Sequence, residues 1–332
     1  MQTELQKKCD LLTENYDRMS KGNKLEFNTM IAAGAAMFAA ADAEADTERV
    51  KECRKLLKEK KGIFSNFRGT AEFIIRCKMA LSKDPEAYLA RLDSVYSELA
   101  NFLSTGQTLL AAMVIAEFAA PEEQSAVVEK TKTIFKEMEK THPWLTNQDD
   151  MPFAALMTAT GKDAVSVYEE AESNYEILKQ ELDATPNTRQ MLSHILALYP
   201  GHAEIKCDRV CRLAAGLKEA KHALSGDRYM AILGMMAGST VPVDELVRAI
   251  GEADDYLKQH EGFHGLFGIG PNVRRMLAVQ MVAAAQEKSG TADAMGGAAV
   301  STAISSSIEV AIITLMVLYT MITISATTGS HS

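Results

Sequence analysis

The side chains that could do chemistry gather in the loops between predicted helices. Trp144, the single tryptophan, precedes Asn147 and the adjacent carboxylates Asp149 and Asp150. Indole and amide groups can bind a ligand, and a carboxylate can act as a general acid or base. Adjacent carboxylates cannot face each other on one regular element, so an acid–base pair would need a second carboxylate from another loop, such as Asp227.

A capping role explains the same acidic pair without catalysis. Aspartate is common at the start of a helix, and an apolar stretch that is predicted to be helical follows Pro152. We therefore expect one of the two aspartates to cap that helix.

Arginines form a second group of candidate residues. Arg68, Arg274 and Arg275 stand near the predicted starts of short apolar helices. A guanidinium that points into a concave interior needs an anionic ligand or an internal carboxylate. With the neighbouring polar residues, the predicted ligand-binding set is Asn66, Arg68, Trp144, Asn147, Arg189, Arg274 and Arg275.

His194 lies beside Ser193 on an apolar helix. A histidine there could serve as a base or a ligand, but a buried neutral histidine explains it as well. The candidate catalytic residues are therefore Asp149, Asp150, His194 and Asp227, with Arg274 as a possible neighbour.

Cys207 and Cys211 are four residues apart, a spacing that could place two metal thiolates on one helical face. Only His202 lies nearby as a third ligand, and no second cysteine pair exists. We expect buried thiols here, no metal site and no cofactor.

Two further patterns have plain structural explanations. The glycine-rich residues 262–270 follow an amphipathic helix and match neither the dinucleotide fingerprint nor the phosphate-binding loop. The basic residues between 49 and 61 alternate with glutamates, which is typical of a solvated helix face.

Composition limits the possible classes of protein. The 332 residues are 47% hydrophobic and 24% charged, which is ordinary for a globular domain and excludes disorder. Aromatic residues make up 6%, and there are only eight prolines, so helix is favoured over strand. The net charge of −9 argues against nucleic acid as a partner.

Short polar breaks recur about every 40 residues, centred on residues 43, 85, 121, 161, 200 and 242. The first helix after each intervening loop is short and apolar, as in residues 30–38, and the second is longer and amphipathic, as in residues 88–99. We predict an all-α fold of repeated helical hairpins, either an α-solenoid or a closed α/α toroid, with essentially no β-sheet. A single domain is expected, with an N-terminal helix over 1–22, hairpin repeats over 23–292 and an apolar C-terminal helix within 293–332.

The C-terminus holds an uncharged run that begins at Val310 and ends at Ala326. Its length is at the short end of what can cross a bilayer, and no Lys or Arg flanks it. We favour a buried core helix over a membrane anchor, and both alternatives stay open. The polar N-terminal residues and the odd number of cysteines, five, predict a cytoplasmic protein with reduced thiols.

Several short motifs resemble a bacterial family, the domain of unknown function 4003. They are residues 66–69 (NFRG), 142–146 (HPWLT), 192–198 (LSHILAL) and 267–270 (FGIG). The resemblance spans nearly the whole chain and implies a bacterial, all-helical protein. It implies no catalytic residues.

Together these patterns favour a helical-repeat scaffold that binds a protein, a peptide or a small anionic ligand along its loops. The alternative is a hydrolase or lyase in which Asp149 or Asp150, Asp227, His194 and Arg274 gather at one end of a helical ring. A third possibility is membrane association through residues 310–326.

Overall fold

The fold is described by a computed structural model that defines residues 1–23, 26–63, 65–69, 71–159, 163–226, 229–265 and 268–288. Every regular element among these residues is a helix, which confirms the all-α prediction. Asp227, Phe267 and the run from 310 to 326 lie outside the described residues.

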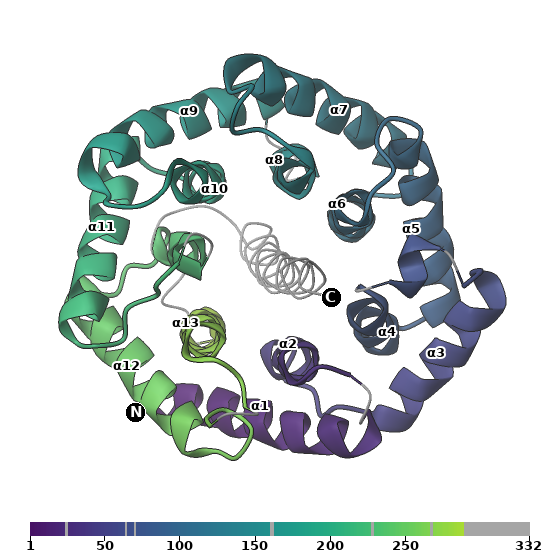
Figure 1. Cartoon of the computed structure of the whole chain (residues 1–332), viewed down its shortest axis with the longest axis horizontal. Helices are drawn as coiled ribbons and strands as arrows, with labels where there is room; N and C mark the ends of the chain where they lie inside the picture. Colours follow the sequence, from purple (N-terminus) through teal and green to yellow (C-terminus); the bar gives the residue numbers. More distant parts are fainter. Residues whose placement is uncertain are drawn as a thin grey trace, which may run out of the picture.

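The helices form two layers, with one layer surrounding the other when the molecule is viewed down its shortest axis (Figure 1). The outer layer contains α1 (Thr3–Gly22), α3 (Thr47–Lys60), α5 (Pro85–Ala100), α7 (Gln124–Thr141), α9 (Ala164–Glu181), α11 (Ala203–Glu219) and α12 (Val243–Gln259). The inner layer contains α2 (Asn28–Ala40), α4 (Glu72–Leu81), α6 (Gly106–Phe118), α8 (Met151–Ala159), α10 (Pro186–Leu196), the 3-10 helix η3 (Tyr229–Met236) and α13 (Pro271–Lys288). Two short 3-10 helices, η1 (Asn66–Arg68) and η2 (Gln148–Asp150), precede α4 and α8.

Residue pattern explains which helices are inside. In α2 every residue from Met30 to Ala39 is buried, so no face of this helix can be turned to water. In α12 the buried apolar residues Leu246, Ile250, Ala253 and Leu257 follow three- and four-residue steps, and the remaining face is polar. Apolar helices therefore lie inside and amphipathic helices cover them.

The beginning and end of the described chain lie side by side. Helix α1 contacts α12 and α13, and α2 also contacts α13 (Figure 1). Tyr16 of α1 packs edge-on against Phe263, with 4.9 Å between ring centroids, and the Tyr256 hydroxyl bonds to the Asp10 carboxylate. These contacts join parts of the chain that are more than two hundred residues apart.

Helix boundaries follow the predicted breaks closely. Pro85, Pro186 and Pro271 occupy the first position of α5, α10 and α13, where the missing N–H costs nothing. Pro152 differs from the expectation, because it is the second residue of α8 and lies inside the helix. Its position in the first turn tolerates proline.

Buried cations on outer helices stabilise the carboxyl ends of inner helices. Lys8 of α1 donates to the carbonyl oxygens of Ala39 and Ala40, at 3.2 and 3.0 Å. Lys206 of α11 donates to those of Leu196 and Tyr199, both at 2.9 Å. Both lysines are 2% exposed. A positive charge at this end satisfies free carbonyls and complements the helix dipole.

Within the part of the chain that the structure describes, no helix is both long and apolar enough to cross a bilayer. The C-terminal run that prompted the membrane alternative lies outside this part of the chain.

Candidate functional site

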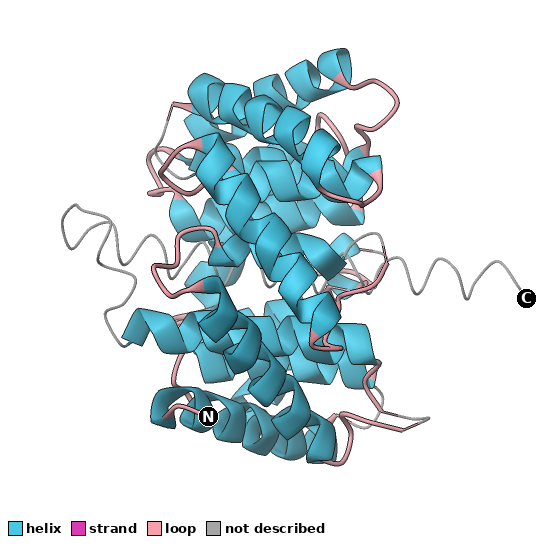
Figure 2. Cartoon of the chain, turned by 90° about the vertical axis from the view of Figure 1, so that its left-hand side faces the viewer, coloured by secondary structure: helices cyan, strands magenta, loops and turns pink. Residues whose placement is uncertain are grey.

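Connections that lead from an outer helix to the next inner element form a surface that we call the loop edge. Because the two helices of each hairpin run in opposite directions, these connections share one edge of the molecule, and Figure 2 shows loops at both edges with helices between them. The loop edge comprises the described parts of residues 23–27, 61–71, 101–105, 142–150, 182–185, 220–228 and 260–270.

Hydrogen bonds link successive parts of the loop edge. The Asn66 amide donates to the Tyr96 hydroxyl at 2.6 Å, and that hydroxyl lies 3.4 Å from the Ser104 hydroxyl. Further along, the Gln107 amide donates to Asp149 Oδ1 at 2.7 Å. The connections are therefore held in place by their neighbours.

Trp144 is the most exposed large apolar side chain of the loop edge. It follows the end of α7 in a turn and is 96% exposed, so its indole contacts almost nothing in the chain. Asn147, three residues later, has a structural role, because its side chain accepts from the Asp149 N–H at 2.9 Å. Of the predicted ligand-binding residues in this loop, the tryptophan is thus the one that is free to contact a partner.

Asp150 caps η2 and not the helix that follows Pro152, which the sequence predicted it or Asp149 to cap. Its carboxylate accepts from the Asn147 N–H at 2.9 Å, so the capped segment is η2, which precedes Pro152. Burial raises the pKa of Asp150 to about 7, and the nearby Asp149 carboxylate contributes to the increase. The two adjacent aspartates therefore have different roles, because Asp149 accepts from Gln107 and Asp150 is a buried cap.

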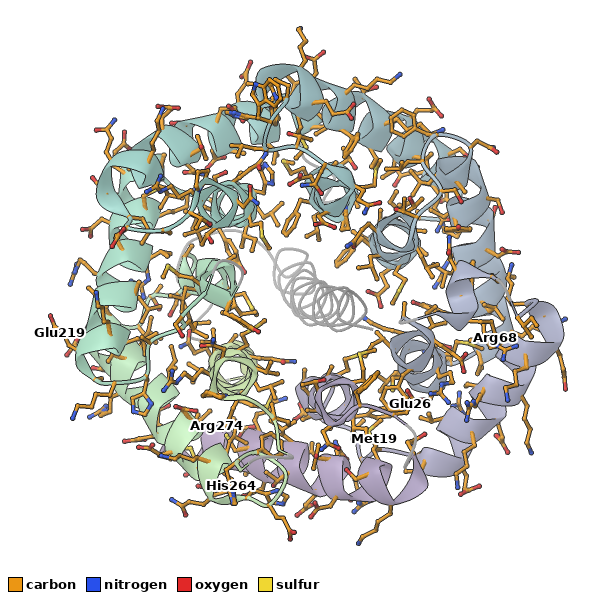
Figure 3. All side chains as sticks on the ribbon, in the orientation of Figure 1. Met19, Glu26, Arg68, Glu219, His264 and Arg274 are labelled. Carbon is orange, nitrogen blue, oxygen red and sulfur yellow. The ribbon has the colours of Figure 1, made fainter. Side chains whose placement is uncertain are left out.

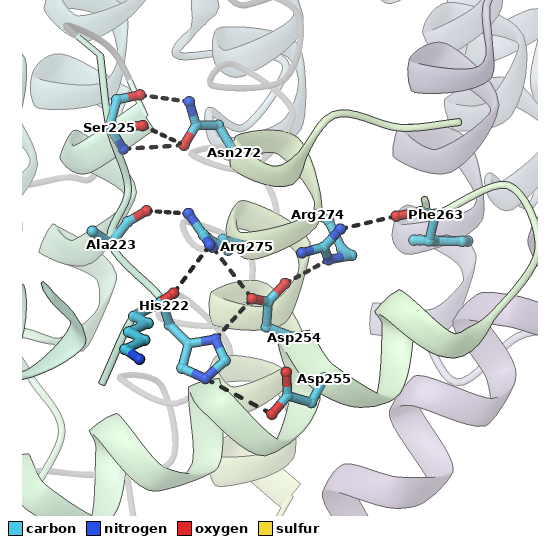
Figure 4. Close-up of polar contacts among 10 residues, drawn as sticks. His222, Ala223, Ser225, Asp254, Asp255, Phe263, Asn272, Arg274 and Arg275 are labelled. Carbon is cyan, nitrogen blue, oxygen red and sulfur yellow. Dashed lines mark hydrogen bonds and ion pairs between the residues drawn. The ribbon is translucent and has the colours of Figure 1, made fainter. Parts of the chain in front are cut away.

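Arg274 and Arg275 bind an internal carboxylate. Their Nε atoms lie 2.6 and 3.2 Å from the two oxygens of Asp254 on α12, and His222 Nδ1 lies 2.8 Å from the same carboxylate (Figure 4). Burial raises the pKa of Asp254, but the bonds from Arg274 and His222 outweigh burial and hold it below its usual value. Of the two options that the sequence left open for these arginines, the internal carboxylate is observed.

The remaining guanidinium donors of this pair bind backbone carbonyls. Arg274 donates to Phe263 at 3.1 Å, and Arg275 donates to Ala223 and Lys221 at 2.6 and 3.1 Å (Figure 4). This network fixes two connections of the loop edge to α13. Arg189 is held in a similar way, because its Nε donates to the Leu182 carbonyl at 3.0 Å.

His194 is buried in α10, with its ring 5.7 Å from that of Phe153. Burial lowers its pKa to about 3, and the neighbouring His142 contributes to the decrease. The imidazole is therefore neutral near pH 7, and its Nδ1 has no hydrogen-bond partner among the described residues.

The side chains predicted to form a catalytic site do not all lie in one part of the molecule. Arg274 belongs to α13, which lies across the inner layer from α8 and its preceding helix η2 (Figures 1 and 3). Asp149 and Asp150 are part of η2, and Asp227 lies outside the described residues. The structure therefore places Arg274 apart from the acidic pair.

Both thiols of the cysteine pair are affected by burial. Burial raises the pKa of Cys207 to about 12 and that of Cys211 to about 11, so the metal-free thiols keep their protons at neutral pH. No cluster of three possible metal ligands occurs in the described ranges.

Sequence reasoning overlooked the charged residues of α4. Glu72, Arg76 and Lys78 interrupt an otherwise apolar inner helix, and Arg76 is only 1% exposed. Charges inside an apolar helix are a signal that could have pointed to this region, because a buried charge needs a partner.

Comparison with known proteins places the chain in a family. No curated protein and no solved structure matches it. A family model described as "Protein of unknown function (DUF4003)" matches residues 15–317, which is most of the chain, and the motifs noted in the sequence fall within this range. The chain therefore belongs to the DUF4003 family.

Proposed function

We propose that this protein is a binding scaffold, in which helical hairpins close into a ring and the loop edge binds a protein, a peptide or a small anionic ligand. Each hairpin contributes one connection to that edge, so a ligand can contact several connections at once. Loops held by a rigid helical framework are where binding residues usually lie.

Exposure of Trp144 is the observation that carries this proposal. Leaving a tryptophan 96% exposed forgoes the burial of a large apolar surface, and tryptophan is enriched among the residues that dominate binding energies. Phe27 and Ile63, which are 71% and 70% exposed, belong to two other connections of the same edge. These side chains suit an apolar part of a partner.

A cytoplasmic location accompanies the proposal. All five cysteines are free thiols, and four of them are buried, which fits a reducing compartment.

Site-specific photo-crosslinking tests the scaffold. A benzoylphenylalanine is placed at position 144 in the full chain, and a matched control places it at position 165 on the opposite edge, where Val165 is 57% exposed. We expect a discrete adduct from position 144 in cells, and none from position 165.

Competition makes this result specific. When the crosslink is repeated in a cell lysate, excess purified wild-type protein should abolish the adduct, and excess Trp144→Ala protein should compete poorly. Equal labelling from both edges, or equal competition by both proteins, would show that the loop edge is not a specific binding surface.

A further inference from the structure

We propose that Arg54, Arg68 and Arg76 form a site for a small soluble oxyanion, a phosphate or carboxylate group, at the start of α4. This inference deepens the proposed function, on which it rests, by giving the small anionic ligand a place at the loop edge. Figure 3 labels Arg68 and Glu26, which both lie beside α4.

One carboxylate serves all three arginines. Glu72, in the first turn of α4, has its Oε1 3.3 Å from Arg54 Nε and 4.0 Å from Arg76 Nε. Its Oε2 lies 3.3 Å from Arg68 Nε. The second carboxylate of the cluster, that of Glu26, accepts from Arg76 Nη2.

The charges of this cluster do not balance. Three guanidinium groups face two carboxylates, which leaves one positive charge in excess. Arg76 is 1% exposed and is paired with Glu26, so the excess charge belongs to the three arginines that share Glu72. A bound anion would supply the missing pair.

The contacts to Glu72 Oε1 are ion pairs without hydrogen-bond geometry. The Nε atoms of Arg54 and Arg76 lie 3.3 and 4.0 Å from this oxygen, and none of the three buried atoms forms a hydrogen bond among the described residues. In the cluster around Asp254, by contrast, Arg274 and Arg275 donate to a carboxylate and to three carbonyls at 2.6–3.2 Å. Nearly all buried polar groups in proteins are bonded, so these two Nε donors can still donate to the oxygens of a bound anion.

The cluster faces water on one side. Side-chain exposure is 41% at Arg54 and 17% at Arg68 but 1% at Arg76, so an anion would approach from the side of the first two arginines. The Arg76 guanidinium lies 5.0 Å from the ring centroid of Phe73, which holds its plane. A planar guanidinium matches the two oxygens of a carboxylate or phosphate.

Calorimetric titration of the full chain with inorganic phosphate, and separately with acetate, tests the site at constant ionic strength. We expect saturable binding of at least one of these anions, and at least tenfold weaker binding by Arg54→Gln. The matched control is Arg212→Gln, since Arg212 is an exposed arginine of α11 whose Nη1 lies 3.5 Å from Asp208; it should bind like the wild type. Absence of binding by the wild type, or equal binding by both variants, would overturn the proposal.

A change in the opposite direction separates binding from folding. Glu72→Gln removes the carboxylate that competes for the three arginines, so we expect tighter anion binding than in the wild type, with circular dichroism confirming the helical fold. Weaker or unchanged anion binding by a folded Glu72→Gln protein would contradict the site. Neither titration depends on the adduct at position 144, so failure of the anion site and failure of the scaffold can be told apart.

Discussion

Replacement of Lys206 by methionine tests the interaction between the two helical layers. Lys206 is 2% exposed, and its ammonium donates to the carbonyl oxygens of Leu196 and Tyr199 at the end of α10 and to the Glu170 carboxylate. Methionine keeps most of the apolar stem and removes only the charge and its donors. The substitution therefore isolates the polar contribution.

The expected cost follows from the hydrogen bonds that the ammonium loses. A hydrogen bond to a charged group contributes about 1.5–3 kcal/mol, and Lys206 makes two of them to carbonyl oxygens, of which that of Leu196 keeps its bond from the Tyr199 N–H at 3.2 Å. The Glu170 side chain is 34% exposed and can be solvated, so it adds little. We expect the free energy of unfolding to fall by about 2–4 kcal/mol, which agrees with the usual cost of breaking a buried pair.

Urea unfolding followed by circular dichroism measures this difference, provided that the slope of the transition is unchanged. The matched control is Lys179→Met on α9, where the lysine is 55% exposed and lies 3.4 Å from the exposed Glu176. That variant should lose about 0.5 kcal/mol or less. Equal losses in the two variants would refute the assignment of Lys206 to the end of α10.

Three further substitutions test the interior. Folding lowers the pKa of His194 from 6.5 to about 3, so as pH falls below about 6.5 the unfolded chain binds a proton that the folded chain does not, and the free energy of unfolding decreases. His194→Phe removes this group and should reduce the decrease. Urea midpoints of both proteins at pH 7 and pH 5 measure the difference. Folding raises the pKa of Asp150 from 3.8 to about 7, so ionisation of this buried carboxyl lowers the free energy of unfolding as pH rises from about 4 to 7. Asp150→Asn cannot ionise. Its free energy of unfolding relative to the wild type should therefore be higher at pH 8 than at pH 4. Gly34→Ala would place a Cβ 2.8 Å from the Phe73 ring, which should lower the free energy of unfolding by about 1–3 kcal/mol; a loss below about 0.5 kcal/mol would show that α2 and α4 pack less closely.

The positions of the helices could be predicted from the sequence because local signals define them. Pro85 with the preceding Asp84 marks the start of α5, and the Asp84 side chain caps it with bonds at 3.0 Å. The uninterrupted apolar residues of α2 likewise required burial on all faces. Such information lies within a few residues of each boundary.

Contacts between distant residues could not be predicted in this way. Asp254 and Arg274 are twenty residues apart on different helices, and only the packing of α12 against α13 brings them together. Lys8 and Lys206 occur in amphipathic outer helices, where a lysine ordinarily belongs to the solvated face. Their burial depends on where the neighbouring inner helix ends, which hydrophobic periodicity does not specify.

The sequence predicts that Trp144 binds a ligand, and the structure leaves this residue 96% exposed. Arg274 and Arg275 were selected by the same reasoning but are bound to Asp254. Residue type alone does not distinguish an arginine that is available to bind a ligand from one that is paired with an internal carboxylate.

The most direct test of the scaffold is a binding titration with the partner that is crosslinked from position 144. We expect Trp144→Ala to weaken this binding at least tenfold, because an exposed tryptophan at the centre of an interface dominates its affinity. Val165→Ala, on the opposite edge, should bind as tightly as the wild type. Unchanged affinity in Trp144→Ala, or a loss confined to Val165→Ala, would contradict the loop edge as the binding surface.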